Sequence, residues 1–246
     1  MHPQIVQPPL LPSWNRFRKL FGGSAELSVL RALEYEILGQ MKYSGKILDF
    51  GGGRNSNYRD RMQEWTAGCT YETANIDRAI EPTYLIEPGQ PLPVESNTFD
   101  IVITLNTLEH IFEVQQALQE LLRVLKPEGE LVATVPFLFR IHGHPDDFLR
   151  GTPSWWGRTL ERIGFSKIVM TPLLWGPMST GLSVAGIPGP LKRARMRAAL
   201  LLDWLYARRL YRYDRKRYTG AVGMAICNAP LGFLISARKP RPVDQG

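Results

Sequence analysis

Short apolar runs, each ended by glycine, proline or a polar residue, recur along most of the chain. Seven of them have the length of a buried strand, and they lie at residues 47–50, 71–77, 84–87, 99–104, 130–136, 165–174 and 232–237. Four further segments have the apolar spacing or the flanking signals of a helix, and they lie at residues 24–42, 58–65, 114–125 and 155–163. Strands that alternate with helices in this way predict an α/β fold.

The first of these strands leads directly into three glycines, Gly51, Gly52 and Gly53, and then into a polar helix start. Glycine suits this position because the turn uses backbone angles that a Cβ penalises, and because a ligand can then lie on the main chain. The phosphate pattern GxxxxGK[ST] is absent and GxGxxG is incomplete. The turn is therefore expected to bind a nucleoside without phosphates rather than a pyrophosphate. The alternative is a tight turn that binds no ligand. Asp49, at the end of the strand, is placed to bind an amine or a hydroxyl.

Two later strands also end in polar residues. Asp77 ends the second strand and follows the glycines by 20 to 30 residues, the separation at which an acid accepts hydrogen bonds from a ribose diol. Leu105 and Asn106 end the fourth strand. Since ligands of parallel sheets bind at the carboxyl ends of the strands, these residues are expected to face the same ligand.

Length and composition predict one principal domain. A chain of 246 residues with 44% apolar content can bury one large core. Residues 1–44 are expected to form an N-terminal extension and helix, and residues 45–246 the main domain, with a helical insertion at about 176–230. No apolar run approaches the ~18 residues that span a bilayer, which predicts a cytoplasmic protein. Two distant cysteines without neighbouring ligands predict neither a disulfide framework nor a zinc site.

The net charge of +7 is concentrated in one segment. Residues 191–218 carry ten Lys or Arg and two acids, so the rest of the chain is nearly neutral and does not present a uniformly basic surface for nucleic acid. This segment follows a Gly/Pro-rich stretch, 176–190, which is predicted to be a loop. The basic helix is expected to be a solvated face, to lie on an anionic membrane surface, or to meet an acceptor that carries phosphate.

The N-terminal residues 1–12 contain four prolines and are predicted to be extended and poorly ordered. The segment that follows, residues 14–21, is short, basic and aromatic. It is predicted to pack as an aromatic lid on its own domain, with contact to a membrane surface as the alternative.

The loop after the fifth strand carries the candidate catalytic residues. His142 and His144 lie where a loop leaves the carboxyl end of a strand, and histidine is suited to proton transfer at neutral pH. The alternative is that Asp147 and Arg150 pair to brace the loop while the histidines only cap it. His142, His144 and Asp146 lack a further well-spaced ligand, so the sequence predicts no metal site here.

These motifs together resemble a known family. The ordered set is Asp49-x-Gly51-x-Gly53, Asp77, Pro91-Leu92-Pro93 with Asn97-Thr98-Phe99-Asp100, Leu108-Glu109-His110, and Arg123-Val124-Leu125-Lys126-Pro127-x-Gly129. Over residues 45–170 it is similar to the class I S-adenosylmethionine-dependent methyltransferases of the methyltransferase-11 type. The resemblance implies a Rossmann-like, doubly wound and mostly parallel sheet whose last strand is antiparallel.

The resemblance also implies a cofactor, S-adenosylmethionine, and the residues that hold it. Asp49, Gly51 and Gly53 would hold the methionine part, and Asp77 the ribose hydroxyls. The remaining cofactor residues expected are Gly52, Arg78, Glu87 near the adenine, Leu92, Leu105 and Asn106. Asn55 departs from the family pattern, which commonly has a third glycine at that position.

The predicted function is methyl transfer from S-adenosylmethionine to a small molecule. The preferred acceptor is a hydroxyl of a sugar, a glycan precursor or a secondary metabolite, because the loop at 140–150 resembles those of family members in such pathways. An RNA methyltransferase and a cofactor-binding but non-catalytic partner subunit are the alternatives. The expected partner is this acceptor, in a form that can carry a phosphate group. Residues 191–217 are expected to make a peripheral contact with the inner membrane surface, and nucleic acid is not favoured as a partner.

Overall fold

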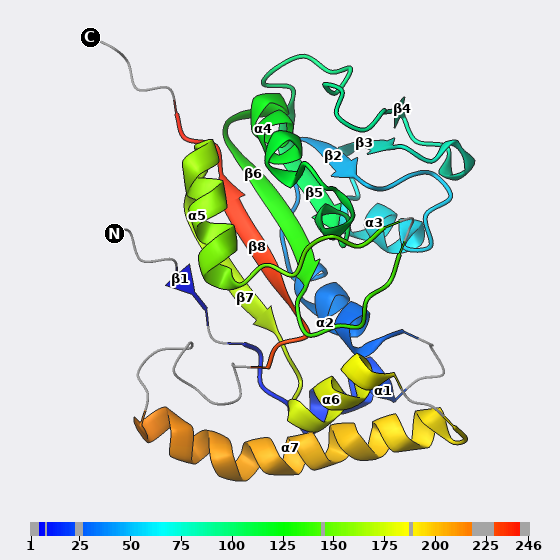
Figure 1. The fold of residues 1–246 in the computed structure, drawn as a ribbon, viewed down its shortest axis with the longest axis vertical. Coiled ribbons are helices and arrows are strands. Elements are labelled where there is room, and N and C mark those ends of the chain that lie inside the picture. Colours follow the sequence, from blue (N-terminus) through cyan, green and yellow to red (C-terminus); the bar gives the residue numbers. More distant parts are fainter. Residues whose placement is uncertain are drawn as a thin grey trace.

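The computed structural model describes residues 5–7, 9–22, 27–143, 146–186, 189–217 and 229–241, and within them one sheet of eight strands forms the centre (Figure 1). The strands are β1 (Ile5–Val6), β2 (Lys46–Phe50), β3 (Thr70–Asn75), β4 (Tyr84–Leu85), β5 (Phe99–Leu105), β6 (Leu125–Pro136), β7 (Ser166–Leu173) and β8 (Gly232–Arg238).

The strand order is β1-β7-β8-β6-β5-β2-β3-β4, and β8 runs antiparallel to both of its neighbours while the other pairs are parallel. The chain therefore winds outward in both directions from β2 and β5, which are paired side by side. In such a sheet ligands bind outside the carboxyl ends of the strands at this switch point. The predicted doubly wound sheet with an antiparallel last strand is confirmed.

Helices cover both faces of the sheet. They are α1 (Trp14–Phe21), α2 (Val29–Leu38), α3 (Arg59–Trp65), α4 (Val114–Val124), α5 (Pro153–Ile163), α6 (Pro177–Ala185) and α7 (Lys192–Arg217), with short 3-10 turns η1 (Arg78–Ile80) and η2 (Leu108–His110). Successive residues of a strand point to opposite faces. Leu48 accordingly packs in the cluster of α4 and α5, and its neighbour Ile47 packs in the cluster of α2 and α3.

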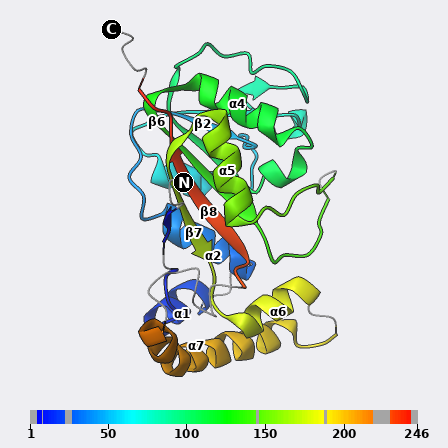
Figure 2. The same ribbon diagram turned by 60° about the vertical axis from the view of Figure 1, so that its left-hand side comes forward.

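A third layer, made of α1, α6 and α7, lies beyond the end of the sheet (Figures 1 and 2). Trp14 of α1 stacks on Phe17 with ring centroids 5.5 Å apart and lies 5.6 Å from Trp204 of α7. Phe17 and Phe21 contact Trp175, which is completely buried. The predicted aromatic lid of residues 14–21 on its own domain is thus confirmed.

The prediction of a loop at residues 176–190 is wrong, because residues 177–185 form α6. Its first turn is held by Asp203 of α7, whose buried carboxylate accepts hydrogen bonds from the backbone N–H groups of Met178 (2.9 Å) and Ser179 (2.8 Å). A Cβ on Gly176, which precedes the helix, would fall 2.4 Å from the Asp203 carboxyl carbon. An acid from a distant helix therefore supplies the N-terminal cap that the local sequence lacks.

The N-terminal part of the chain also differs from the sequence prediction. The helix predicted from Ser24 begins at Val29 and is capped by Ser28, while Ser24 lies outside the described residues. Residues 5–6, predicted to be poorly ordered, extend the sheet as β1 beside β7. These residues and α2 thus share the sheet and core of the main domain. Within the described ranges, no helix combines the length and the apolar character needed to cross a bilayer.

Candidate functional site

A hollow of about 500 Å³ opens at the carboxyl ends of the strands near the switch point. Phe50 at the end of β2, Ile76 just after β3, Glu87 just after β4 and His110 after β5 all contribute to its wall. Leu92 lines it as well, so two of the predicted cofactor residues, Glu87 and Leu92, meet here. The hollow is concave and mostly apolar with a few polar groups, as small-molecule sites generally are.

The glycine turn lies beside this hollow and crosses other segments closely. Gly51 has φ +102° and donates a hydrogen bond to the carbonyl of Ala74 on β3 (2.8 Å). A Cβ there would fall 2.1 Å from Thr107 Oγ1, and one on Gly53 would fall 2.5 Å from the Ile80 carbonyl. Glycine is therefore already required by the packing of the chain itself. The contact of Gly51, Gly52 and Gly53 with a cofactor stays a prediction, since none of them lines the hollow.

Asp49 is buried inside the protein at the end of β2. Its carboxylate accepts hydrogen bonds from the hydroxyls of Tyr58 (3.2 Å) and Tyr71, and it closely approaches Gly52. Burial raises the pKa of Asp49 to about 6, and the two tyrosine hydrogen bonds oppose this rise. The carboxylate is thus satisfied within the fold, and its contact with a ligand amine stays a prediction.

Asp77 and Arg78 lie exposed at the same edge of the sheet as the glycine turn. The side chain of Asn75, at the end of β3, donates to the carbonyl of Gly51 and so ties the ends of β2 and β3 together. Asp77 Oδ1 accepts from the backbone N–H of Ala79 (2.8 Å) and caps η1. The two predicted halves of the cofactor site therefore lie on one side of the sheet, although Asp77 and Arg78 do not line the hollow.

Leu105 and Asn106 end β5, but they do not line the hollow either. Leu105 is buried, and Asn106 has φ +49° and donates from Nδ2 to Glu34 Oε1 of α2 at 2.8 Å. Glu34 is fully buried, and this burial raises its pKa while Arg31 opposes the change. Asn106 thus serves to fasten α2 to the sheet in this structure, and its role toward the cofactor stays a prediction.

Glu109, which the sequence analysis did not select, is the most unusual side chain beside the hollow. It follows β5 in η2 and is fully buried, yet neither carboxyl oxygen hydrogen-bonds to a described residue. Burial raises the pKa of Glu109 to about 8, and the nearby Glu34 acts in the same direction. Buried polar groups are normally paired, so this carboxyl requires an explanation. The only signal in the sequence was its place in the motif Leu108-Glu109-His110.

Two histidines approach Glu109. His110 Nε2 lies 3.7 Å and His142 Nε2 3.9 Å from Glu109 Oε1, and the two imidazole centroids are 5.1 Å apart. These three side chains offer ligand atoms that all lie within 4.8 Å of one another, which fits a metal ion. No metal site was predicted at His142, because the candidate ligands near it in the sequence were only His144 and Asp146. His144 lies outside the described residues.

The loop that carries His142 is braced as the alternative reading of the sequence predicted. Arg150 forms an ion pair with both oxygens of Asp147. Asp147 Oδ2 also accepts from the backbone N–H of His142 (2.9 Å) and lies 3.3 Å from its Nδ1. Burial lowers the pKa of His142, while Asp147 opposes the change. The imidazole is therefore held in place and favours the neutral form.

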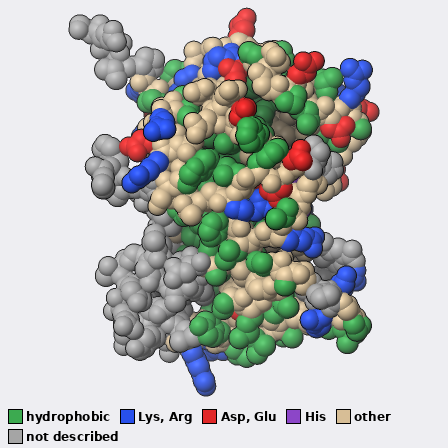
Figure 3. All heavy atoms as spheres, viewed as in Figure 1, with side chains coloured by type: hydrophobic (Ala, Val, Ile, Leu, Met, Phe, Trp, Pro, Cys, Tyr) green, Lys and Arg blue, Asp and Glu red, His purple; other side chains and the backbone are tan. Residues whose placement is uncertain are grey.

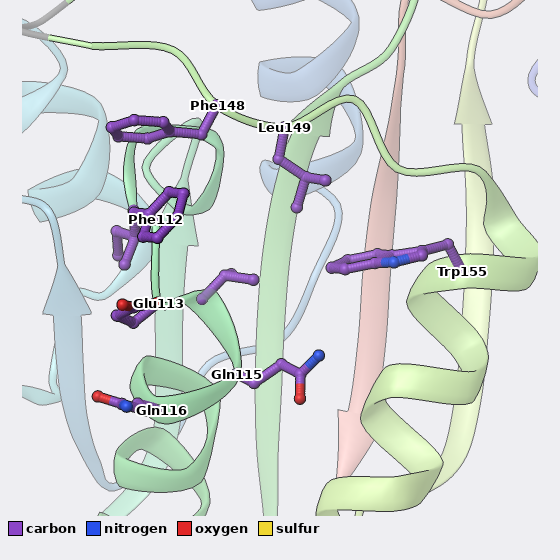
Figure 4. Close-up of a pocket in the computed structure, with 9 residues that line it drawn as sticks. Phe112, Glu113, Gln115, Gln116, Phe148, Leu149 and Trp155 are labelled. Atoms are coloured by element: carbon purple, nitrogen blue, oxygen red, sulfur yellow. The ribbon is translucent and has the colours of Figure 1, made fainter.

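A second hollow, of about 420 Å³ and drawn in Figure 4, shares lining residues with the first. Phe148 lies over Phe112 on one side of it, with ring centroids 5.4 Å apart, and Trp155 reaches in from α5 on the other side, with Leu149 above. Phe112 is 73% exposed and Phe148 49% exposed. Both rings line the two hollows, so the pair forms a wall between them.

Comparison with known proteins finds similarity to methyltransferases. A family model described as a methyltransferase domain matches residues 48–133. A sarcosine/dimethylglycine N-methyltransferase from Halorhodospira halochloris is 26% identical over 140 residues, which cover 52% of this chain and 46% of that protein. The chain thus spans about half the length of this curated relative.

Solved structures share the fold. A S-adenosylmethionine-dependent methyltransferase from Archaeoglobus fulgidus superposes with a TM-score of 0.52 at 16% identity, covering 93% of this chain and 100% of that one. A phosphoethanolamine N-methyltransferase 2 from Haemonchus contortus, solved with phosphomonomethylethanolamine and S-adenosylhomocysteine, has a TM-score of 0.50 at 15% identity over 92% of this chain and 57% of that one. With the strand order and the ordered motifs, the match over residues 48–133 identifies a class I S-adenosylmethionine-dependent methyltransferase domain in this chain.

Proposed function

We propose that this chain transfers the methyl group of S-adenosylmethionine to a hydroxyl of a sugar, a glycan precursor or a related small metabolite. The observation that carries the proposal is the pair of adjoining hollows at the carboxyl ends of the strands. One reaches the strand ends where class I methyltransferases take their cofactor, and the other is lined by exposed aromatic rings.

The larger hollow suits the adenosine part of the cofactor. Ile76 and Ile86 give it apolar walls, and the carboxylate of Glu87 lies at its rim as an acceptor for an amino group. Asp77, on the same edge, is placed for the ribose hydroxyls. The Haemonchus contortus enzyme of similar fold was solved with S-adenosylhomocysteine, the product of such a cofactor, which supports S-adenosylmethionine as the cofactor.

The smaller hollow suits the acceptor. Its rings, Phe112, Phe148 and Trp155, present flat apolar surfaces of the kind that pack against the C–H faces of a sugar ring. The wall at Phe148 separates it from the cofactor hollow, and the Glu109, His110 and His142 cluster lies close to the same loop. Glu113, Gln115 and Gln116 also line the smaller hollow and offer hydrogen-bonding groups to the hydroxyls of an acceptor bound there.

The reaction asks mainly for orientation. The O–C bond forms as the S–C bond breaks, the cofactor leaves as S-adenosylhomocysteine, and the hydroxyl proton passes to water at the opening beside His142, whose side chain is 35% exposed. Holding the acceptor oxygen in line with the methyl carbon supplies about 7 kcal/mol or more of the barrier reduction. Of the two predicted catalytic histidines, His142 lies within the described residues, and we assign it a role in positioning the acceptor oxygen.

A small amine is the second candidate acceptor. The curated relative is named for sarcosine and dimethylglycine, and the Haemonchus contortus structure holds phosphomonomethylethanolamine, so both act on or bind amines. An amine needs no metal or base once it is neutral, because its lone pair attacks directly. Incubation of the protein with methyl-labelled S-adenosylmethionine and separate pools of nucleotide sugars, small amines and RNA distinguishes these cases. Label in the sugar pool supports the proposal, label in amines supports the second candidate, and label in RNA contradicts both.

The basic helix α7 supports a peripheral membrane contact as part of the proposal. Leu202 and Leu205 of α7, and Leu191 just before it, are at least half exposed. Arg208 and Arg209 of the same helix are exposed cations. Figure 3 shows hydrophobic side chains gathered over α6 and α7, with Lys and Arg among them. Such a surface suits anionic lipid headgroups. In a flotation assay at low salt, the protein should float with vesicles that contain anionic lipid. Failure to float with either anionic or neutral vesicles would refute the proposed membrane contact.

A further inference from the structure

We propose that Glu109, His110 and His142 form a binding site for one divalent transition-metal ion, and that this ion coordinates the acceptor hydroxyl. The ion site follows from the geometry of this chain alone. Its use toward the acceptor rests on the proposed function, and the two parts are tested separately.

The three side chains already converge on one point. Both imidazoles turn Nε2 toward Glu109 Oε1, at 3.7 Å from His110 and 3.9 Å from His142. Ligand atoms bound to one tetrahedral ion at usual Zn–N and Zn–O lengths are about 3.4 Å apart. These two separations are slightly wider and all three ligand atoms lie within 4.8 Å of one another, so an inward movement of the side chains would complete the set.

The other nitrogen of each imidazole faces an acceptor, as in established metal sites. His110 Nδ1 lies within hydrogen-bond distance of the Asp146 carbonyl oxygen. His142 Nδ1 lies within hydrogen-bond distance of the Arg140 carbonyl oxygen (3.3 Å) and also 3.3 Å from Asp147 Oδ2. The nearest donor to His142 Nδ1, Arg150 Nη2, is farther away at 3.5 Å and is paired with Asp147. Each Nδ1 therefore carries the proton, which leaves Nε2 as a lone pair for the ion. A ligand histidine held by a carboxylate or a carbonyl in this way binds metal more tightly.

Glu109 supplies the independent sign that something binds here. Its side chain is 1% exposed, and neither carboxyl oxygen hydrogen-bonds to a described residue. A buried carboxyl without a partner is costly, and the cost is removed when a cation binds it. The imidazoles connect the site to the outside, because the side chains of His110 and His142 are 15% and 35% exposed.

The donor set indicates the class of ion. Two imidazole nitrogens and one carboxylate oxygen suit Zn²⁺, Fe²⁺, Co²⁺ or Ni²⁺, whereas Mg²⁺ and Ca²⁺ prefer oxygen ligands throughout. Three protein ligands leave at least one coordination position open. An acceptor hydroxyl in that position would lose its proton to water more readily, and its oxygen would then attack the sulfonium methyl carbon as the S–C bond breaks.

The site can be tested on the untagged, full chain in buffer freed of metal, with Co²⁺ as the probe. Calorimetry gives stoichiometry and affinity, and the visible absorption of bound Co²⁺ reports its ligands. The variants are Glu109→Gln and His142→Ala at the ligands, Asp147→Asn behind His142, and Glu161→Gln, an exposed acid on α5, as the matched control. The thermal unfolding midpoint of each variant shows whether it is folded.

We expect one Co²⁺ per chain with a visible spectrum. Glu109→Gln and His142→Ala should weaken binding by about 100-fold, Asp147→Asn by about 10-fold, and Glu161→Gln should leave it unchanged. No binding by the wild-type chain, or an affinity in Glu109→Gln and His142→Ala equal to that of the wild type, overturns the proposal. If Glu109→Gln does not fold, His110→Ala takes its place, because that side chain is partly exposed.

The role toward the acceptor is tested by adding Zn²⁺ or EDTA to methyl transfer reactions. Loss of metal should reduce turnover without changing the affinity for S-adenosylhomocysteine. Metal binding without any effect on turnover would refute the role in the reaction and keep the site. Absence of transfer to every acceptor, with Co²⁺ still bound, would instead count against the proposed function.

Discussion

The buried carboxyl of Asp49 makes the stability of the protein depend on pH in a way that a single substitution removes. Asp49 has no exposed surface and is held by Tyr58 and Tyr71. Replacing it by Asn keeps the size and an acceptor oxygen for the tyrosine hydroxyls but removes the ionisation. The perturbation therefore isolates the cost of a buried charge at the end of β2.

The magnitude follows from the pKa. Burial raises the pKa of Asp49 from 3.8 to about 6, so the folded chain holds this proton more tightly than the unfolded chain. The stability contributed by the proton is complete below pH 3.8 and is lost as the pH rises to about 6. At about 1.4 kcal/mol per pKa unit the whole loss is about 3 kcal/mol, of which about 2 kcal/mol falls between pH 4.5 and pH 7.

Urea unfolding of the wild type and Asp49→Asn across this pH range measures the effect. The free energy of unfolding of Asp49→Asn should rise relative to wild type by about 2 kcal/mol from pH 4.5 to pH 7 and then stay constant. Asp60→Asn, at an exposed acid of α3, is the control and should show no such trend. A difference between Asp49→Asn and wild type that does not change with pH would refute the reasoning.

Three other substitutions test separate parts of the account, with Glu161→Ala as a common exposed control. Trp155→Ala should raise the KM for the acceptor about tenfold, through lost contact in the smaller hollow, while calorimetry shows unchanged affinity for S-adenosylhomocysteine. Asn106→Ala should lower the free energy of unfolding by about 1–3 kcal/mol in urea titrations, because Glu34 loses its donor and the backbone has φ +49°; equality with the control would exclude this role. Asp203→Ala should cost about 1–2 kcal/mol by removing the cap of α6, with a matching loss of helical circular dichroism.

Much of the sheet was predictable from the sequence because its signals are local. The apolar run of β2 ends in glycine within a few residues, and the alternation of apolar runs with helical periods gave the α/β class. The positions of Asp77 and Glu87 on one edge follow from the rule that parallel strands end at the same side. The resemblance over residues 45–170 then implied a doubly wound, mostly parallel sheet with an antiparallel last strand.

The misses depend on residues that are far apart in the chain. The stretch that forms α6 is rich in Gly, Ser, Thr and Pro, and its helix is capped by Asp203 of α7, which a local window does not contain. Glu109 lacks any local sign of its burial, because the loop carrying His142 folds back over it and Phe148 donates a backbone hydrogen bond to its carbonyl. The prediction placed the chemistry on the histidines alone, since the sequence does not show that His110 and His142 approach the same carboxyl.

The central claim is that S-adenosylmethionine binds at the carboxyl edge of β2, β3 and β4, with its ribose at Asp77. Calorimetric titration of the wild type, Asp77→Ala and the control Asp60→Ala with S-adenosylhomocysteine tests it most directly. The account predicts one site per chain in the wild type and the control, and an affinity at least about tenfold weaker in Asp77→Ala, since hydrogen bonds to a charged group contribute about 1.5–3 kcal/mol. No binding by the wild type, or the same affinity in Asp77→Ala, would contradict it.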